Sequence, residues 1–251
     1  MSAHYDSYDY SSYWQGREYE HESEAYAIKS FLSKIKKIDK ALEIGGGFGR
    51  LLPLYVFRAK RVSFTEASAK LLSQAKKTHK FKNVEFIQST LENLPKKLKR
   101  RSFDLIVMIR VIHHLPDSDS TFNTIEKLAA NNGYLILEFA NKMHFKNVIV
   151  HLLKKDFAFF RNRETTDIRS SKSKKDKTIP FLNFHPSLIK SELEKHNFKI
   201  VETRSVSNIR SPFLKKYLQK EILLEIEKFL QKPLSYLYFG PSIFILARKK
   251  G

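Results

Sequence analysis

Five short apolar runs, alternating with segments of helical pattern, constrain the fold of this chain more than any other feature of its sequence. The expected strands are residues 40–45, 61–67, 83–88, 103–109 and 133–140. Most of these runs are continuously apolar, which is typical of strands covered on both faces. The expected helices between them are residues 50–60, 68–77 and 117–133. This alternation predicts an α/β fold with a doubly wound parallel sheet.

The pattern changes after residue 140. Residues 145–160 are expected to form an amphipathic helix with one apolar and one basic face, and residues 161–178 a mobile loop. A helix followed by a strand is expected within residues 185–206. A second amphipathic helix is expected at 212–232, before a final strand at 242–249.

Charge and composition limit which binding partners and which cellular compartment the sequence predicts. The net charge of +20 favours an anionic partner, either nucleic acid or a lipid surface, unless the lysines serve only solubility. No apolar stretch approaches the roughly 20 residues of a membrane span, and the first residues lack the pattern of a signal peptide. The absence of cysteine excludes disulfides, thiolate metal sites and sulfur nucleophiles. We therefore expect a cytoplasmic protein without a metal site.

The first expected strand runs into the glycine-rich stretch "ALEIGGGFGR". A strand, a tight glycine turn and a helix start together form the place where a doubly wound sheet holds a nucleotide-like ligand, because glycine permits positive φ and close approach to the backbone. A dinucleotide pattern needs glycine at its first, third and sixth positions, but after Gly45 and Gly47 the sixth residue is Arg50. This departure argues against a nucleotide-linked oxidoreductase.

The motif Glu43-x-Gly45-x-Gly47-x-Gly49 instead resembles the first motif of class I S-adenosylmethionine-dependent methyltransferases. Glu66 ends the second strand, where that family places an acid for the ribose hydroxyls of its cofactor. The segments "VEFIQSTLENLP", "FDLIVMIRVIHHLPD" and "GYLILEFAN" are similar to the family's third, fourth and fifth strands with their loops. The resemblance implies a Rossmann-like sheet of seven strands, parallel except for a reversed C-terminal strand, with an inserted helical cap. It also implies an enzyme whose cofactor is S-adenosyl-L-methionine.

The same resemblance implies a set of cofactor-binding residues. They are Glu43, Gly45, Gly46, Gly47, Gly49, Glu66, Ala67, Thr90, Leu91 and Arg110. Thr90 stands where the family commonly has an acid for the adenine amino group, so the backbone near Leu91 is expected to carry more of the adenine recognition. His113, beyond the fourth strand, is the candidate catalytic residue, either as a base or to orient the acceptor; the alternative is that "HHLPD" only builds a turn.

The resemblance and the composition also predict the domain organisation. Residues 1–26 are expected to form an arm or lid, and residues 27–251 a methyltransferase domain with inserts at about 141–182 and 209–238. Within the arm, the candidates for contact with the cofactor are Tyr13, Trp14, Arg17 and Tyr19. The alternative for the arm is a disordered tail followed by a packing helix.

The sequence excludes one class of methyl acceptor and favours another. Without cysteine, attack on a pyrimidine ring through a thiolate is excluded. "RVIHHLPD" stands where many amino-methylating nucleic-acid enzymes have Asn/Asp-Pro-Pro-aromatic, so the sequence resembles the small-molecule branch, which includes relatives of quinone-biosynthesis methyltransferases. We expect methyl transfer by in-line displacement to a small-molecule or lipid-like acceptor. The alternatives are an RNA methyltransferase using the basic surface and a non-catalytic cofactor-binding relative.

The helix expected at 145–160 leaves three interpretations open. It could be a lid whose apolar face shapes the pocket, a helix that docks on a membrane holding a lipid acceptor, or a basic ridge against RNA. Peripheral membrane contact is thus one of the expected partner modes.

Overall fold

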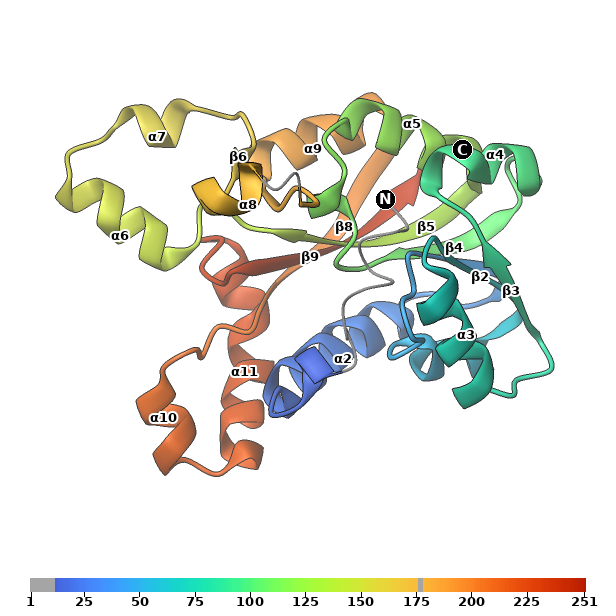
Figure 1. Ribbon diagram of the computed structural model, residues 1–251, viewed down its shortest axis with the longest axis horizontal. Helices are drawn as coiled ribbons and strands as arrows, with labels where there is room; N and C mark the ends of the chain where they lie inside the picture. Colours follow the sequence, from blue (N-terminus) through green and yellow to red (C-terminus); the bar gives the residue numbers. More distant parts are fainter. Residues whose placement is uncertain (1–11, 176–177) are drawn as a thin grey trace.

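The computed structural model describes residues 12–175 and 178–251, and it is built around one seven-stranded sheet (Figure 1). The strand order is β3-β2-β1-β4-β5-β9-β8. The strands are β1 (Ile38–Ile44), β2 (Ala59–Glu66), β3 (Val84–Gln88), β4 (Phe103–Met108), β5 (Ala129–Ala140), β8 (Phe198–Val206) and β9 (Ser242–Lys249). All pairs from β3 to β5 are parallel, and β9 runs antiparallel to both of its neighbours. The Rossmann-like sheet with a reversed C-terminal strand is therefore confirmed.

Helices cover both faces of the sheet, as Figure 1 shows. The longer ones are α2 (Glu18–Leu32), α3 (Ala69–Thr78), α5 (Ser118–Leu128), α9 (Pro186–Lys195) and α11 (Lys220–Ser235), with the short α4 (Leu94–Lys97) beside them. In β4, Ile106 and Met108 pack into the apolar core under α5 and α9, whereas Leu105 and Val107 pack into the core under α2 and α3. Successive side chains of a strand point to opposite faces, so a strand buried on both faces must be apolar throughout.

The segment after the glycines does not form the helix expected at 50–60. It forms two short 3-10 turns, Leu52–Leu54 and Val56–Arg58. The adjacent side chains of Tyr55 and Val56 are both fully buried.

The two inserts, residues 141–182 and 209–238, also differ in detail from expectation. The expected helix at 145–160 is divided into α6 (Phe145–Leu153) and α7 (Ala158–Arg161), because Lys155 has a φ of 55° and interrupts the helix. The expected loop at 161–178 contains β6 (Thr166–Asp167) and α8 (Ser171–Lys175), and β6 pairs with β7 (Leu182–Asn183). The helix expected at 212–232 is likewise divided into α10 (Pro212–Tyr217) and α11.

The N-terminal arm is described from residue 12 onward, so residues 1–11 of the expected lid lie outside the described part of the chain. Helix α2 runs across residue 26, the boundary expected for the arm. Within residues 12–175 and 178–251, no helix has both the length and the apolar character needed to cross a bilayer.

Candidate active site

A cleft of about 980 Å³, part of it open to solvent, lies at the carboxyl ends of the parallel strands β1 to β4, where open α/β sheets bind their ligands. Nine of the ten expected cofactor-binding residues line this cleft: Glu43, Gly45, Gly46, Gly47, Glu66, Ala67, Thr90, Leu91 and Arg110. Gly49 is not part of its wall, and of the two neighbouring histidines it is His114 that lines it. Leu51, Leu71 and Leu115 add apolar surface.

The glycines are required largely by the protein's own packing. Gly45, Gly47 and Gly49 have φ angles of 66°, 59° and 86°, in the left-handed region that side chains disfavour. A Cβ atom on Gly45 would lie 2.5 Å from a methyl group of Val111, and one on Gly46 would lie 2.3 Å from the buried ring of Phe64. The glycine pattern predicts space for a ligand; at Gly45 and Gly46 the missing side chains also make room for Val111 and Phe64.

Glu66 joins the loops that follow β1 and β2. Its side chain is buried, and its two carboxylate oxygens accept hydrogen bonds from the backbone N–H groups of Gly47 (2.8 Å) and Ser68 (2.9 Å). A carboxylate offers about four acceptor positions, so one group can hold a loop and also receive ligand hydroxyls. Glu66 thus fixes the glycine turn relative to the end of β2.

Glu43 is buried at the floor of the cleft and accepts a hydrogen bond from the hydroxyl of Tyr55. Burial raises the pKa of Glu43 to about 8, although the Tyr55 hydrogen bond and the charge of Arg50 act in the opposite direction. The side chain is therefore mostly protonated at neutral pH in the absence of a cationic partner.

A second cavity of about 940 Å³ adjoins the cleft, and Arg110 lines both. Its wall comes from segments far apart in the sequence. They are the arm (Tyr13, Trp14, Arg17), the loop after β4 (Arg110, His113), the end of β5 (Glu138, Ala140), the first insert (His144, Ile168, Phe181) and the segment after β8 (Ser207, Arg210). The arm and the first insert therefore both contribute side chains to the wall of this second cavity.

Arg110 is fixed at the junction of the two cavities. It has a φ of 60°, and its backbone N–H donates to Glu138 (2.8 Å) on β5. Its guanidinium donates to the hydroxyl of Tyr13 (3.0 Å) and pairs with Glu24 (3.5 Å). The pKa of Glu138 is raised by its burial, with the charge of Arg110 acting in the opposite direction. These contacts connect the loop after β4 to the arm.

Three of the four arm residues expected near the cofactor line the second cavity rather than the cleft. The guanidinium of Arg50, which lines the cleft, lies 3.5 Å from the ring centre of Trp14 and also pairs with Glu24. Tyr19 points elsewhere, since its hydroxyl donates to Glu227 (2.7 Å) on α11. Tyr19 lines neither cavity and anchors α2 to the second insert, so its expected contact with the cofactor stays a prediction without support from the geometry.

His113 is buried beside the second cavity. Its ring stacks on Phe181 of the first insert, with ring centres 4.4 Å apart, and burial lowers its pKa well below the usual value. Its Nδ1 atom has no hydrogen-bond partner among the described residues. His113 is thus a neutral imidazole with one ring nitrogen unsatisfied.

The sequence of residues 35–185 matches the model of a family described as a methyltransferase domain. This chain belongs to that methyltransferase family. The resemblance identified from the glycine motif is confirmed: the methyltransferase is an enzyme, and its cofactor is S-adenosyl-L-methionine. A search of the curated proteins found no match.

Solved structures share the fold of this methyltransferase at low sequence identity. A protein from Listeria monocytogenes assigned as an S-adenosylmethionine-dependent methyltransferase has a TM-score of 0.63 at 13% identity, over 92% of this chain and 99% of its own. An S-adenosylmethionine-dependent methyltransferase from Thermotoga maritima has a TM-score of 0.60 at 20% identity, over 100% of both chains. A protein from Haloferax volcanii, assigned as a methyltransferase and solved with the Trm112 activator, has a TM-score of 0.62 at 12% identity, over 96% and 93%.

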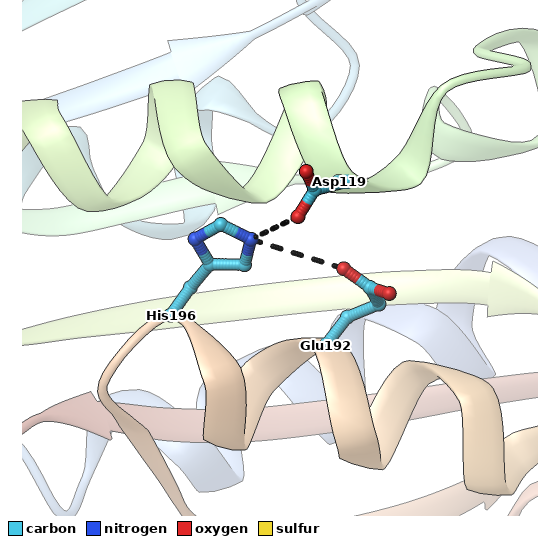
Figure 2. A group of neighbouring side chains, drawn as sticks. All are labelled: Asp119, Glu192 and His196. Atoms are coloured by element: carbon cyan, nitrogen blue, oxygen red, sulfur yellow. Dashed lines mark hydrogen bonds and ion pairs between the residues drawn. The ribbon is translucent and has the colours of Figure 1, made fainter.

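The methyltransferase also contains a polar cluster that the sequence analysis, which expected no metal site, did not identify. Asp119 of α5 meets Glu192 and His196 at the end of α9, as Figure 2 shows, and their potential ligand atoms lie within 4.8 Å of one another. The Nε2 atom of His196 lies 2.8 Å from Asp119, but the ammonium of Lys195 lies 2.6 Å from the same carboxylate oxygen. The arrangement is an ion-pair network that joins two helices. The spacing of four residues between Glu192 and His196 was its only signal in the sequence.

Proposed function

We propose that this methyltransferase transfers the methyl group of S-adenosylmethionine to a small-molecule or lipid-like acceptor by in-line displacement. The observation that carries the proposal is the pair of adjoining cavities with Arg110 in the wall of both. When bound, the cofactor supplies a methyl group on a sulfonium, so that a carbon–sulfur bond breaks as the acceptor–carbon bond forms. The chain's task is then mainly alignment and exclusion of water.

The residues of the cleft fit this cofactor. Glu66 presents a buried carboxylate at the end of β2, where two adjacent hydroxyls can donate to it in a charge-assisted pair. Glu43 would be ionised by a nearby cationic group, because opposite charge offsets the burial that raises its pKa. Leu71 and Leu91 offer apolar surface for a planar base. Ala67, Thr90, Gly45, Gly46 and Gly47 line the same cleft and would also contact the cofactor.

The second cavity is the proposed acceptor site. Tyr13 and Trp14 contribute to its wall from the arm, so that the arm would exclude water from the reacting atoms. The unsatisfied Nδ1 atom of neutral His113 would accept a hydrogen bond from the acceptor and orient it. A strong base is required only if the acceptor must lose a proton before the transfer.

One basic surface of the molecule lies away from the cleft. Five cationic residues line a groove of about 830 Å³: Lys40, Arg61, Lys82, Lys97 and Lys99. This groove includes residues near the amino ends of β1 to β4, whereas the cleft lies at their carboxyl ends. RNA bound in the groove would therefore sit at the wrong end of the sheet for methyl transfer. The cytoplasmic location stays a prediction.

The test is incubation of the protein with methyl-labelled cofactor and fractionated cell extract. We expect label in a small-molecule or lipid fraction, and much less of it with the Glu66→Gln variant at limiting cofactor. In parallel, titration calorimetry measures cofactor binding without any acceptor. Label in RNA, or intact cofactor binding with no labelled fraction, would contradict the proposed acceptor class. A His113→Ala variant that binds the cofactor but transfers at the full rate would end the role given to His113.

A further inference from the structure

Exposed apolar side chains gather in the two inserts. In the described part of the chain, 17 large apolar side chains are exposed, and all but Phe57 and Val201 belong to residues 141–182 or 209–238. Leu153 of α6 and Phe229 of α11 are 80% and 79% exposed. Large contiguous apolar surfaces on a folded protein mark interaction sites.

The two inserts lie on the same side of the molecule, which is the left side of Figure 1, away from α3 and α4. They are also directly connected. The backbone N–H of Phe145, at the start of α6, donates to the carbonyl of Phe239, which follows the second insert (2.9 Å). The rings of these two residues stack with centres 4.6 Å apart. The exposed residues of the two inserts therefore lie on one side of the molecule, and we call them together the insert face.

The insert face is also strongly basic. The two inserts contain 17 lysines and arginines against seven acids, so 72 of the 251 residues carry half of the net charge of +20. Lys146, Lys154 and Lys155 lie within or directly after the exposed part of α6. A second copy of the chain is a poor partner for this face, because like charges would meet across a symmetric interface.

We propose that the insert face docks on the anionic surface of a lipid bilayer. Apolar side chains of α6, α10 and α11, together with Phe157, enter the headgroup region, and the surrounding lysines pair with lipid phosphates. The protein lies on the membrane and does not span it. The idea that docking brings a lipid-like acceptor to the enzyme rests on the proposed function. Ile168 and Phe181 of the first insert line the second cavity, so the docked face adjoins the proposed acceptor site.

The test is co-sedimentation of the full-length protein with vesicles of phosphatidylcholine alone or with added phosphatidylglycerol. We expect binding to the anionic vesicles that weakens with salt, and little binding to neutral ones. The variant Leu153→Ser/Phe157→Ser/Phe229→Ser should bind anionic vesicles about tenfold or more weakly, because each change removes several carbon groups that the bilayer would bury. Phe57→Ser is the matched control: Phe57 is also 79% exposed but lies outside the inserts, so its loss should leave binding unchanged.

Thermal unfolding of each variant verifies that it is folded before binding is compared. Equal binding of the triple variant and wild type, or equal binding to neutral and anionic vesicles, would overturn the docking proposal. A concentration-dependent dimer that the triple variant abolishes, or RNA binding without vesicle binding, would assign the face to another partner and overturn it as well. The readout needs neither cofactor nor acceptor. Vesicle binding without methyl transfer would therefore refute the proposed function alone, and methyl transfer without vesicle binding would refute docking alone.

Discussion

At the carboxyl end of the sheet Leu42 and Val107 are fully buried, whereas in the first insert Leu153 is 80% exposed. Both regions have regular apolar patterns, and both form secondary structure. The difference lies in what covers them: the strands are enclosed by helices of the same chain, and the apolar stripe of α6 faces outward. An apolar pattern therefore predicts that a side chain is to be covered, but it does not identify the molecule that covers it.

The largest effect expected from this comparison is on stability. Leu42→Ala should lower the free energy of unfolding by about 2–5 kcal/mol, because it leaves a cavity in the core. Leu153→Ala, the same substitution in the insert face, should change it by less than about 0.5 kcal/mol. Urea unfolding of the two variants measures both values. Similar losses would mean that the insert face is covered within the isolated protein.

A second test compares two glycines that share a backbone conformation. Gly45 and Gly16 have φ angles of 66° and 69°, but a Cβ atom on Gly45 would meet Val111 at 2.5 Å, whereas one on Gly16 would meet nothing within 4 Å. Gly16→Ala should cost about 1 kcal/mol for the left-handed conformation alone, and Gly45→Ala about 3 kcal/mol. Chemical unfolding measures the loss of stability in both variants. Equal losses would show that close packing against Val111 adds nothing to the cost of the substitution at Gly45.

The third prediction concerns binding at the cleft. Glu66→Gln should weaken cofactor binding by about 10- to 100-fold, since hydrogen bonds to a charged acceptor contribute about 1.5–3 kcal/mol. Glu85→Gln makes the same change on β3, in the basic groove near the amino ends of the strands, and should leave the affinity unaltered. Titration calorimetry with both variants tests the assignment. Unchanged affinity in Glu66→Gln would remove Glu66 from the cofactor site.

The last prediction is a dependence of stability on pH that arises at the cleft. The carboxyl group of Glu43 has a pKa of about 8 in the folded chain and 4.5 without the protein environment. The folded state thus holds a proton that the unfolded state releases, so the free energy of unfolding falls as the pH rises from about 4.5 to 8, by at most about 1.4 kcal/mol per pH unit. The free energy of unfolding, measured across this pH range, should change less steeply with pH in Glu43→Gln. An identical slope in that variant would show that another group carries the dependence.

The sequence predicted the sheet well because β4 and the second half of β5 are nearly continuous apolar runs, which is typical of strands buried on both faces. The glycine motif predicted the cleft because the loop after β1 is local in sequence. Contacts between distant segments were not predictable. The arm meets Arg110 across 97 residues through Tyr13, and Tyr19 meets Glu227 across 208. The helix break at Lys155 depends on a single φ angle, which no pattern in the sequence indicates.

The carboxylate of Glu66 has a consequence for how selectivity can change in this enzyme. It clamps the turn around Gly47 and the start of α3 through Ser68 before any ligand arrives. The entropic cost of ordering these loops is thus met during folding, and binding need not meet it again. The same carboxylate oxygens would recognise the ligand and hold the two loops. A mutation of Glu66 that changes ligand recognition would therefore also loosen the loops after β1 and β2. New acceptor preferences can arise more freely in the inserts, where a changed residue leaves the clamp untouched.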